Sequence, residues 1–359
     1  MKVMTVLGTR PEIIRLSQVI PLLDALCDHI LVFTGQNFDP NLCDIFFDQL
    51  GVRAPDHRFE CQGSSAMAQV GVILAEVDAL LERHKPERFL VLGDTNSALS
   101  TIAAKRRGIP VFHMEAGNRC FDPRVPEEVN RRIIDHSSDV LMPYTVNSRD
   151  HLLREGFAAN RVYVTGNPIH EVLTHYAPQI ESSDVLTRLG ATPGGYFLVT
   201  LHRAENVDLP DRLDSFLEGL IAIHSQYSLP VLLSLHPRTR SRLQASGRAL
   251  DKGVVALEPP GFFDFVHLEK NARAVLSDSG TVQEEGCIFG IPTVTLRDVT
   301  ERPETMEAGS NILTGCEPED LLRALRLVLE HDGPWVTPAE YLAPAVSRTV
   351  AKLLFSHWS

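Results

Sequence analysis

Carboxylate side chains are concentrated in residues 113–132, HMEAGNRCFDPRVPEEVNRR. Glu115 follows a run typical of a buried strand, and Glu127 and Glu128 follow a short loop. A further carboxylate, Asp94, ends the nearby strand pattern FLVLGD. Carboxylates that converge raise one another's pKa, which can supply both an acid and a base near neutral pH. The alternative is a structural network of ion pairs with the interleaved arginines, Arg119, Arg124, Arg131 and Arg132.

The segment GTRPE, residues 8–12, follows the first strand pattern. Thr9 and Glu12 have capping-box spacing, and Pro11 is tolerated in a first helical turn. The N–H groups of that turn, together with Arg10, could hold a phosphate group. A plain strand-to-helix turn with an exposed arginine explains the same residues equally well. The segment matches neither the dinucleotide fingerprint nor the P-loop.

The segment SDSGTVQEE, residues 277–285, closes the strand pattern AVLSDSG. Ser279, Gly280 and Thr281 are small enough for a phosphate to approach helix N–H groups. Glu284 or Glu285, one turn further on, could accept hydrogen bonds from ribose hydroxyls. These residues favour a bound nucleoside diphosphate over the alternative, an N-capped helix with acidic residues near its start.

Two histidines follow strand patterns of the second half of the chain. His202 lies in TLHRAEN, and His236 lies in HPRT one strand later. Histidine can carry protons near neutral pH, although a single histidine is more often structural. Metal-ligand spacings such as H-E-x-x-H do not occur in the sequence, so we expect no catalytic metal.

Short apolar, β-branched runs alternate with amphipathic segments and predict parallel βαβ units. The first series of predicted strands covers 3–8, 30–35, 89–94, 111–117, 139–144 and 162–167; the second covers 196–203, 231–237, 254–260, 274–280, 293–298 and 311–315. Two series predict an α/β protein with two doubly wound domains, divided near Gly166-Asn167-Pro168. Most predicted strands end in polar residues, and parallel sheets bind ligands at that edge. We therefore expect a cleft where the two edges face each other.

Composition excludes several classes of protein. The 359 residues carry 34 Lys+Arg and 46 Asp+Glu, a net charge of -12, which argues against nucleic-acid binding. We expect no membrane span and a cytoplasmic location, because no long apolar run or leader occurs. The six cysteines form no C-x-x-C pair, so we expect reduced thiols rather than disulfides or zinc.

Taken together, the motifs resemble those of the non-hydrolysing UDP-N-acetylglucosamine 2-epimerases. GTRPE, TGQ, GDT, H-x-EAG-x-R, PEE-x-NR, TGNP, HR-x-EN, HP-x-T, DSG-x-x-QEE and R-x-x-TERPE occur in this order between residues 8 and 304. The resemblance implies the GT-B architecture of two Rossmann-like domains. These would be residues 1–167, completed by a last helix at 346–359, and residues 168–345. It also implies a homodimer and no cofactor.

The resemblance implies roles for particular residues. The catalytic residues would be Asp94, Glu115, Glu127 and His202. The UDP-sugar would be bound by Arg10, Arg119, Arg131, His236, Ser279, Gly280, Thr281 and Glu285. In the family's reaction a base removes the C2 proton of the sugar while UDP leaves C1. UDP then adds back to the 2-acetamidoglucal intermediate after protonation on the other face.

The exact substrate stays open. TGQN, GNRCFD and DSGT resemble a subgroup that acts on modified UDP-sugars, such as UDP-2,3-diacetamido-glucuronate and 6-deoxy UDP-2-acetamido sugars. A hydrolysing 2-epimerase that releases N-acetylmannosamine, a GT-B glycosyltransferase and a silent UDP-sugar sensor are the alternatives from other classes.

Overall fold

The computed structural model describes residues 1–36, 40–61, 63, 65–330 and 333–358; of residues 40–43 it describes only the backbone. The chain divides into two compact units. Unit 1 comprises residues 1–174 and 339–359, and unit 2 comprises residues 175–338. The predicted domain limits, 167/168 and 345/346, lie close to these divisions and stay a prediction about the folding domains.

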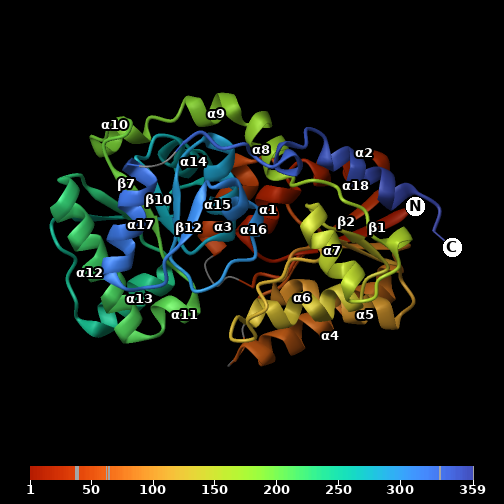
Figure 1. Ribbon diagram of the computed structural model, residues 1–359. Helices are drawn as coiled ribbons and strands as arrows, with labels where there is room; N and C mark the ends of the chain where they lie inside the picture. Colours follow the sequence, from red (N-terminus) through yellow and green to blue (C-terminus); the bar gives the residue numbers. More distant parts are fainter. Residues whose placement is uncertain (37–39, 62, 64, 331–332, 359) are drawn as a thin grey trace. The chain divides into compact units, whose positions relative to one another are not determined.

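Each unit is built on a parallel sheet with six strands in the described part of the chain (Figure 1). The strands of unit 1 are β1 Lys2–Leu7, β2 Asp28–Phe33, β3 His57–Arg58, β4 Arg88–Leu92, β5 Val111–Met114 and β6 Val140–Met142. The strands of unit 2 are β7 Phe197–Thr200, β8 Val231–Ser234, β9 Val254–Leu257, β10 Ala274–Ser277, β11 Thr293–Thr295 and β12 Asn311–Leu313.

The strand orders are β3-β2-β1-β4-β5-β6 and β12-β11-β10-β7-β8-β9. Both are the doubly wound Rossmann order, in which the direction of winding reverses next to the first strand. The reversal falls between β1 and β4 in unit 1 and between β7 and β10 in unit 2. Ligands bind at the carboxyl ends of strands at such reversal points. The predicted fold class is therefore confirmed.

Helices cover both faces of each sheet. Unit 1 has α1 Arg10–Leu16, α2 Val19–Leu26, α3 Pro40–Gln49, α4 Ala66–His84, α5 Thr101–Arg106, α6 Pro126–His136, α7 Val146–Arg154 and α18 Val346–Phe355, with short 3-10 helices η1 Asn96–Ser100, η2 Ala159–Arg161 and η3 Ala339–Leu342. Helix α8 Ile169–His175 belongs to unit 1 except for its last residue, with which unit 2 begins. Unit 2 has α9 Ala177–Glu181, α10 Val185–Leu189, α11 Ala204–Val207, α12 Pro210–Tyr227, α13 Pro237–Ser246, α14 Phe262–Lys270, α15 Gly280–Phe289, α16 Pro303–Ala308 and α17 Pro318–Glu330.

Apolar strands sit between these helical layers, so the residues of the central strands are buried on both faces, whereas the edge strands β3, β9 and β12 are partly exposed. In unit 1, α4, α5 and α6 lie on one side of the sheet, and α2 and α18 lie on the other (Figure 1). In unit 2, α12 and α17 pack against one face, and α10, α14 and α15 contribute to the core on the other. Among the described residues, helices that combine the length and the apolar character needed to cross a bilayer are absent.

The prediction of a strand at residues 162–167 is wrong. The segment forms only a single bridge, between Val162 and Leu141 at the edge of the sheet. Two further backbone hydrogen bonds attach it to β6 and the loop after it, from Tyr163 to Leu141 and from Thr165 to Pro143. Gly166 then turns at a φ of +84°, so the pairing does not continue. The short edge strand β3 replaces it as the sixth strand of the sheet.

Candidate active site

Glu115 follows β5 in a strained backbone conformation. Its φ is +67°, a left-handed value that costs a non-glycine residue about 1–3 kcal/mol. Its carboxylate forms a 2.5 Å ion pair with Arg15 of α1 and accepts a 3.1 Å hydrogen bond from the Asn118 side chain. A Cβ atom on Gly93 would lie 3.4 Å from the same carboxylate, so Glu115 lies beside the residue that precedes Asp94. Strain of this kind is common at functional sites.

Asp94 follows β4 and is tied to helix α6. The Arg131 guanidinium donates to the Asp94 carboxylate at 2.8 Å and to the Glu128 carboxylate at 3.0 Å. Asn130 of the same helix donates to the backbone carbonyl of Asp94 at 2.9 Å. Arg131, predicted to bind substrate, is thus buried between two carboxylates of the chain. These contacts fix Asp94 against the helix that carries Glu127.

Glu127 and Glu128 are adjacent but have different surroundings. Glu127 is half-buried in the first turn of α6, whereas Glu128 is buried and accepts a hydrogen bond from the Cys120 N–H at 3.0 Å. Burial alone would raise the pKa of Glu128, but this hydrogen bond and Arg131 hold the pKa below its usual range. Glu128 therefore acts as a structural anion, and Glu127 is the carboxyl group of this pair that is more exposed.

Arg119 is enclosed in a buried charge network. Its guanidinium donates to both oxygens of Glu155, at 2.9 and 2.6 Å, and lies 2.8 Å from Asp135. Asp135 also contacts the His113 ring at 2.8 Å and the Gly117 N–H at 3.2 Å. The Arg119 side chain is 0% exposed. This position favours a role in holding the loop after β5 over direct contact with a ligand.

The GTRPE turn begins helix α1 as the capping-box spacing predicts. Thr9 is its N-cap, and the Glu12 carboxyl accepts from the Gly8 and Thr9 N–H groups at 3.0 and 2.7 Å. Thr95, next to Asp94, donates to the other oxygen of Glu12 at 3.1 Å. Glu12 therefore connects the ends of β1 and β4, a role that its capping-box spacing does not reveal. Arg10, half-buried, lies over the Phe46 ring at 5.7 Å.

In unit 2, His202 and Asp278 meet at the reversal point of the sheet. The His202 Nδ1 atom lies 2.9 Å from Asp278 Oδ1, and the N–H groups of His202 and Arg203 donate to Oδ2 at 2.9 and 2.8 Å. Burial alone would raise the pKa of Asp278, but His202 and these N–H donors hold the pKa below its usual range. A carboxylate on Nδ1 orients the imidazole and leaves Nε2 as its other functional atom. Asp278 was not among the predicted site residues, although it precedes Ser279 in the same motif.

His236 lies near His202, at the N-cap of α13. The two ring centroids are 5.4 Å apart, and His236 Nδ1 accepts from the Arg238 N–H at 3.2 Å. The two histidines follow neighbouring strands, β7 and β8. The sequence pattern thus predicted correctly that both lie at the carboxyl edge of this sheet.

The predicted phosphate loop starts helix α15. Ser279 is its N-cap, and Gly280 and Thr281 are its first two residues. A Cβ atom on Gly280 would lie 2.8 Å from Glu301 Oε1, so glycine suits this position. Glu301 is buried and is held by Arg297 at 2.7 Å. Both charged residues belong to the motif R-x-x-TERPE. The motif contributed to the family resemblance, but the sequence did not indicate a role for either residue.

Glu284 and Glu285 are adjacent but have different surroundings, as Glu127 and Glu128 do. Glu284 forms an ion pair with Arg302, whereas Glu285 lies beside another buried carboxyl group, that of Glu269. Glu285 is 3% exposed. Among the described residues, groups of three or more metal-ligating side chains that could hold a metal ion are absent.

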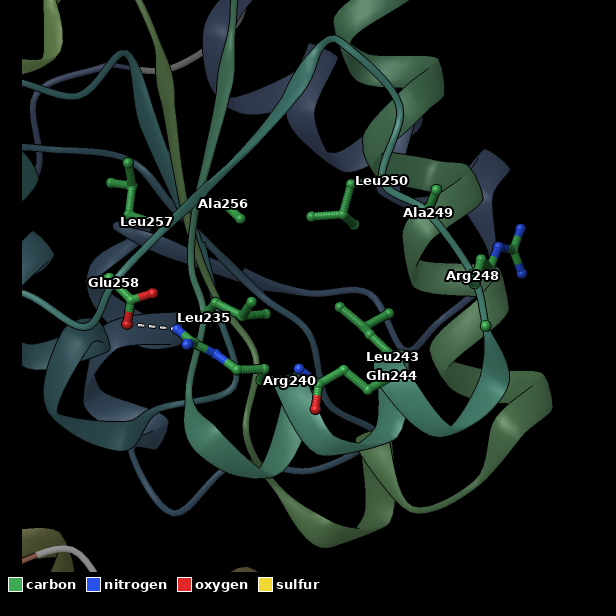
Figure 2. A pocket seen from close by; sticks show the side chains of 11 residues that line it. Leu235, Arg240, Leu243, Gln244, Arg248, Ala249, Leu250, Ala256, Leu257 and Glu258 are labelled. Atoms are coloured by element: carbon green, nitrogen blue, oxygen red, sulfur yellow. Dashed lines mark hydrogen bonds and ion pairs between the residues drawn. The ribbon is translucent and has the colours of Figure 1, made fainter.

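A separate hollow in unit 2 lies between α13 and strands β8 and β9 (Figure 2). Its volume is about 500 Å³. Its wall is largely leucine and alanine, with the Arg240–Glu258 ion pair at one side. Leu235, the residue before His236, is part of the wall, but none of the predicted site residues lines it. The hollow is therefore distinct from the predicted site residues of unit 2, which are His202, His236, Ser279, Gly280, Thr281 and Glu285.

Two Rossmann-like units with charged residues at their reversal points define a nucleotide-binding α/β enzyme of the GT-B type. A family model described as UDP-N-acetylglucosamine 2-epimerase matches residues 24–354. The chain belongs to the UDP-N-acetylglucosamine 2-epimerase family, and the resemblance found in its motifs is confirmed.

Individual relatives agree with this family assignment. The UDP-N-acetylglucosamine 2-epimerase of Methanocaldococcus jannaschii is 39% identical over 94% of this chain and 95% of that protein. The UDP-2,3-diacetamido-2,3-dideoxy-D-glucuronate 2-epimerase of Pseudomonas aeruginosa is 38% identical over 92% of each chain. The crystal structure of the M. jannaschii enzyme in complex with UDP-GlcNAc and UDP has a TM-score of 0.94 and 38% identity, and the match covers 99% of this chain and 100% of that one.

Proposed function

We propose that the protein is a non-hydrolysing 2-epimerase that interconverts UDP-N-acetylglucosamine and UDP-N-acetylmannosamine, or the 2-epimers of a closely related UDP-2-acetamido sugar. The observation that carries the proposal is the division of groups between the carboxyl edges of the two sheets. Acidic groups at the ends of β4 and β5 suit proton transfer, whereas the His202–Asp278 pair and the start of α15 suit a diphosphate and a ribose.

In the proposed reaction, Asp94, Glu115 and Glu127 supply the acid and the base. A carboxylate takes the C2 proton of the sugar, the electrons of the C–H bond form the C1=C2 double bond, and UDP leaves C1 with the electrons of the C–O bond. A carboxylic acid then protonates C2 on the opposite face, and a UDP oxygen adds to C1. No redox cofactor takes part, since no electrons are gained or lost overall.

His202 stays assigned to catalysis, acting on the diphosphate as it leaves, and the other predicted residues are assigned to substrate binding and orientation. His202, His236 and Arg10 would stabilise the departing diphosphate, and Ser279, Gly280 and Thr281 would give it access to N–H groups of α15. Glu285 would accept hydrogen bonds from the ribose. Arg119 and Arg131 would act by positioning the loop after β5 and the Asp94 carboxylate, because both are buried in ion pairs.

The decisive experiment is incubation in D2O with a panel of UDP-sugars, followed by NMR. The proposal expects a UDP-linked 2-epimer that carries deuterium at C2, and little product with a Glu127→Gln variant. If no UDP-sugar gains deuterium at C2, the proposal is wrong. Release of free N-acetylmannosamine and UDP would instead indicate a hydrolysing enzyme.

A second candidate substrate is UDP-2,3-diacetamido-2,3-dideoxy-glucuronate. A relative that is named for its action on this sugar is 38% identical to the chain, almost the same as the 39% of a relative named for UDP-N-acetylglucosamine. The panel should therefore include the diacetamido uronate and a 6-deoxy sugar. The sugar with the highest kcat/KM identifies the substrate.

We also propose a homodimer that works in the cytoplasm. The dimer is implied by the motif resemblance, and light scattering after size-exclusion chromatography measures it. The location is supported by the cysteines, because the five whose side chains are described are all free, as is usual in the cytosol. Cys43 lies outside the described side chains.

A further inference from the structure

The side chain of Asn130 connects helix α6 to the turn that carries Asp94. This turn, residues 93–96, leads from β4 into η1 and is called the β4 turn below. The Asn130 amide donates to the backbone carbonyl of Asp94 at 2.9 Å and to the side-chain carbonyl of Asn96 at 3.3 Å. Both hydrogen atoms of one amide group are therefore given to the same turn.

The orientation of these amide groups is fixed by their partners. The Gln69 NH2 group donates to two backbone carbonyls, at 3.1 and 3.0 Å, so its side-chain oxygen is the atom that faces Asn96. The Asn96 NH2 group donates to that oxygen at 3.1 Å, which turns the Asn96 carbonyl toward Asn130. Carbonyl oxygens can only accept hydrogen bonds, so Asn130 must be the donor in both of its contacts.

Asn130 lies on the inward face of α6, between Glu127 and the core. Glu127, Asn130, Arg131 and Ile134 have the spacing i, i+3, i+4 and i+7, which places them on one side of a helix. Ile134 is buried in the core of unit 1, whereas Ile133 is exposed. Glu127 precedes Asn130 by three residues, about 4.5 Å along the helix axis, and α6 starts at the carboxyl edge of the parallel sheet. Asn130 therefore attaches the part of α6 that presents Glu127.

The β4 turn is also held by elements other than α6. The Gly93 carbonyl lies 2.9 Å from His113 Nε2 of β5, and the Gly93 N–H donates to β5 at 3.0 Å. Thr95 donates to Glu12 of α1 at 3.1 Å. Loss of the Asn130 side chain would therefore leave the turn in place and release the first turns of α6 from it.

We propose that Asn130 is a positioning residue that sets the distance between the Asp94 and Glu127 carboxyl groups. The inference rests on the proposed function, which assigns both groups to proton transfer at C2 of the sugar. Arg131 also links α6 to Asp94, but through the Asp94 side chain, whereas Asn130 holds the backbone. Asn130 is neutral, so its removal changes the geometry and leaves the charges unchanged. A misplacement of about 1 Å can lower a rate by about 10²-fold.

The first test compares kcat and UDP binding for the wild type and Asn130→Ala. Calorimetry gives the affinity for UDP and the number of binding sites per chain, and kcat is divided by that number. We expect kcat per binding site to fall by about 10- to 100-fold. The affinity for UDP should stay within about threefold of wild type, because most of the groups assigned to UDP belong to unit 2. The matched control is Asn147→Ala, which changes a half-buried asparagine of α7 and should leave kcat unchanged.

Deuterium at C2 gives a readout that does not depend on how much of the variant is folded. In D2O, the carboxyl group that removes the C2 proton exchanges it with solvent. Deuterium then returns either to the same face of the intermediate, which regenerates the starting sugar as UDP adds back, or to the opposite face, which gives the 2-epimer. A displaced α6 should weaken protonation by Glu127 more than protonation by the groups held on the sheet.

The quantity to measure is the ratio of deuterium in the recovered sugar to deuterium in the epimer, at low conversion. The two starting sugars are UDP-N-acetylglucosamine and UDP-N-acetylmannosamine, or the pair of epimers that the substrate panel identifies. In Asn130→Ala this ratio should rise from one epimer and fall from the other, each by about threefold or more. A smaller amount of folded enzyme would change neither ratio.

Three outcomes would overturn the inference. They are a fall in kcat per binding site of less than about threefold, a number of binding sites that falls in step with kcat, and deuterium ratios equal to wild type from both epimers. The proposed function is judged on the wild type alone. A wild type that gains no deuterium at C2 would overturn that function and this inference with it, whereas an active wild type with an unaffected Asn130 variant would overturn the inference only.

Discussion

Asp278 Oδ1 lies 2.9 Å from His202 Nδ1, although the two residues are 76 positions apart in the chain. They meet because β10 and β7 are neighbours in the sheet, with Ser277 paired to Thr200. Each residue follows its strand by one or two positions. A buried carboxylate that holds an imidazole in this way determines which ring nitrogen carries the proton.

This pairing predicts the effect of Asp278→Asn. The amide oxygen would stay with the N–H groups of His202 and Arg203, so the amide NH2 would face His202 Nδ1 and favour the wrong tautomer. We expect kcat to fall about 100-fold or more, with UDP affinity within about threefold of wild type. Steady-state kinetics and calorimetry measure the two quantities. The control is Asp298→Asn, an exposed aspartate near the end of β11, and equal losses in both variants would contradict the prediction.

Glu127→Gln should abolish proton transfer while leaving the fold intact. Glu127 is only half-buried in the first turn of α6, so its loss should change the unfolding free energy by less than about 1 kcal/mol. Loss of an acid or base should lower kcat by about 10²- to 10⁴-fold. The measurements are deuterium incorporation at C2 and thermal unfolding. Glu319→Gln, which also changes an acidic residue in the first turn of a helix, is the matched control; activity in the Glu127 variant close to that of the control would argue against the assigned role.

Arg119→Met should destabilise the protein rather than weaken substrate binding alone. It would leave Asp135 and Glu155 without their shared cation in a buried site, and breaking a buried ion pair costs about 3–5 kcal/mol. Denaturant unfolding measures this loss. Arg124→Met removes an exposed arginine of the same loop that pairs with Asp122, and it should be nearly neutral. A stable Arg119 variant with a raised KM would show instead that Arg119 contacts the substrate.

Glu12 should make stability depend on pH. Burial raises its pKa from 4.5 to about 7, against the hydrogen bonds from Thr9, Gly8 and Thr95. The folded state therefore favours the protonated acid. This contribution to the free energy of unfolding is fully present below about pH 4.5 and is lost as the pH rises through about 7. The free energy of unfolding should fall by about 3 kcal/mol over this range.

The check on Glu12 is denaturant unfolding of the wild type and Glu12→Gln at pH 5 and pH 8. The neutral glutamine should remove this part of the pH dependence. Its amide can still accept from the Gly8 and Thr9 N–H groups and donate to Thr95. If both proteins lose the same free energy between the two pH values, Glu12 is not the group responsible.

The sequence by itself determined the two doubly wound sheets and the family. Apolar runs that alternate with helical patterns leave few other solutions, and the motifs at the strand ends carry the resemblance. It also predicted that Asp94, Glu115 and His202 follow strands, because a strand ends where its apolar run ends. The strand predicted at 162–167 failed because an apolar run does not reveal whether a neighbour is available to pair with it.

Only the tertiary structure decided what each charged residue contacts. From their positions in the sequence, Arg119 and Glu127 are equally plausible as residues that contact the substrate. In the structure, Arg119 is buried in a charge network, whereas Glu127 is half-buried. The pairing of Asp278 with His202 and of Arg119 with Glu155 depends on strand order and helix packing. Those are set by the burial of the whole core rather than by local spacing, so no short segment of the sequence encodes them.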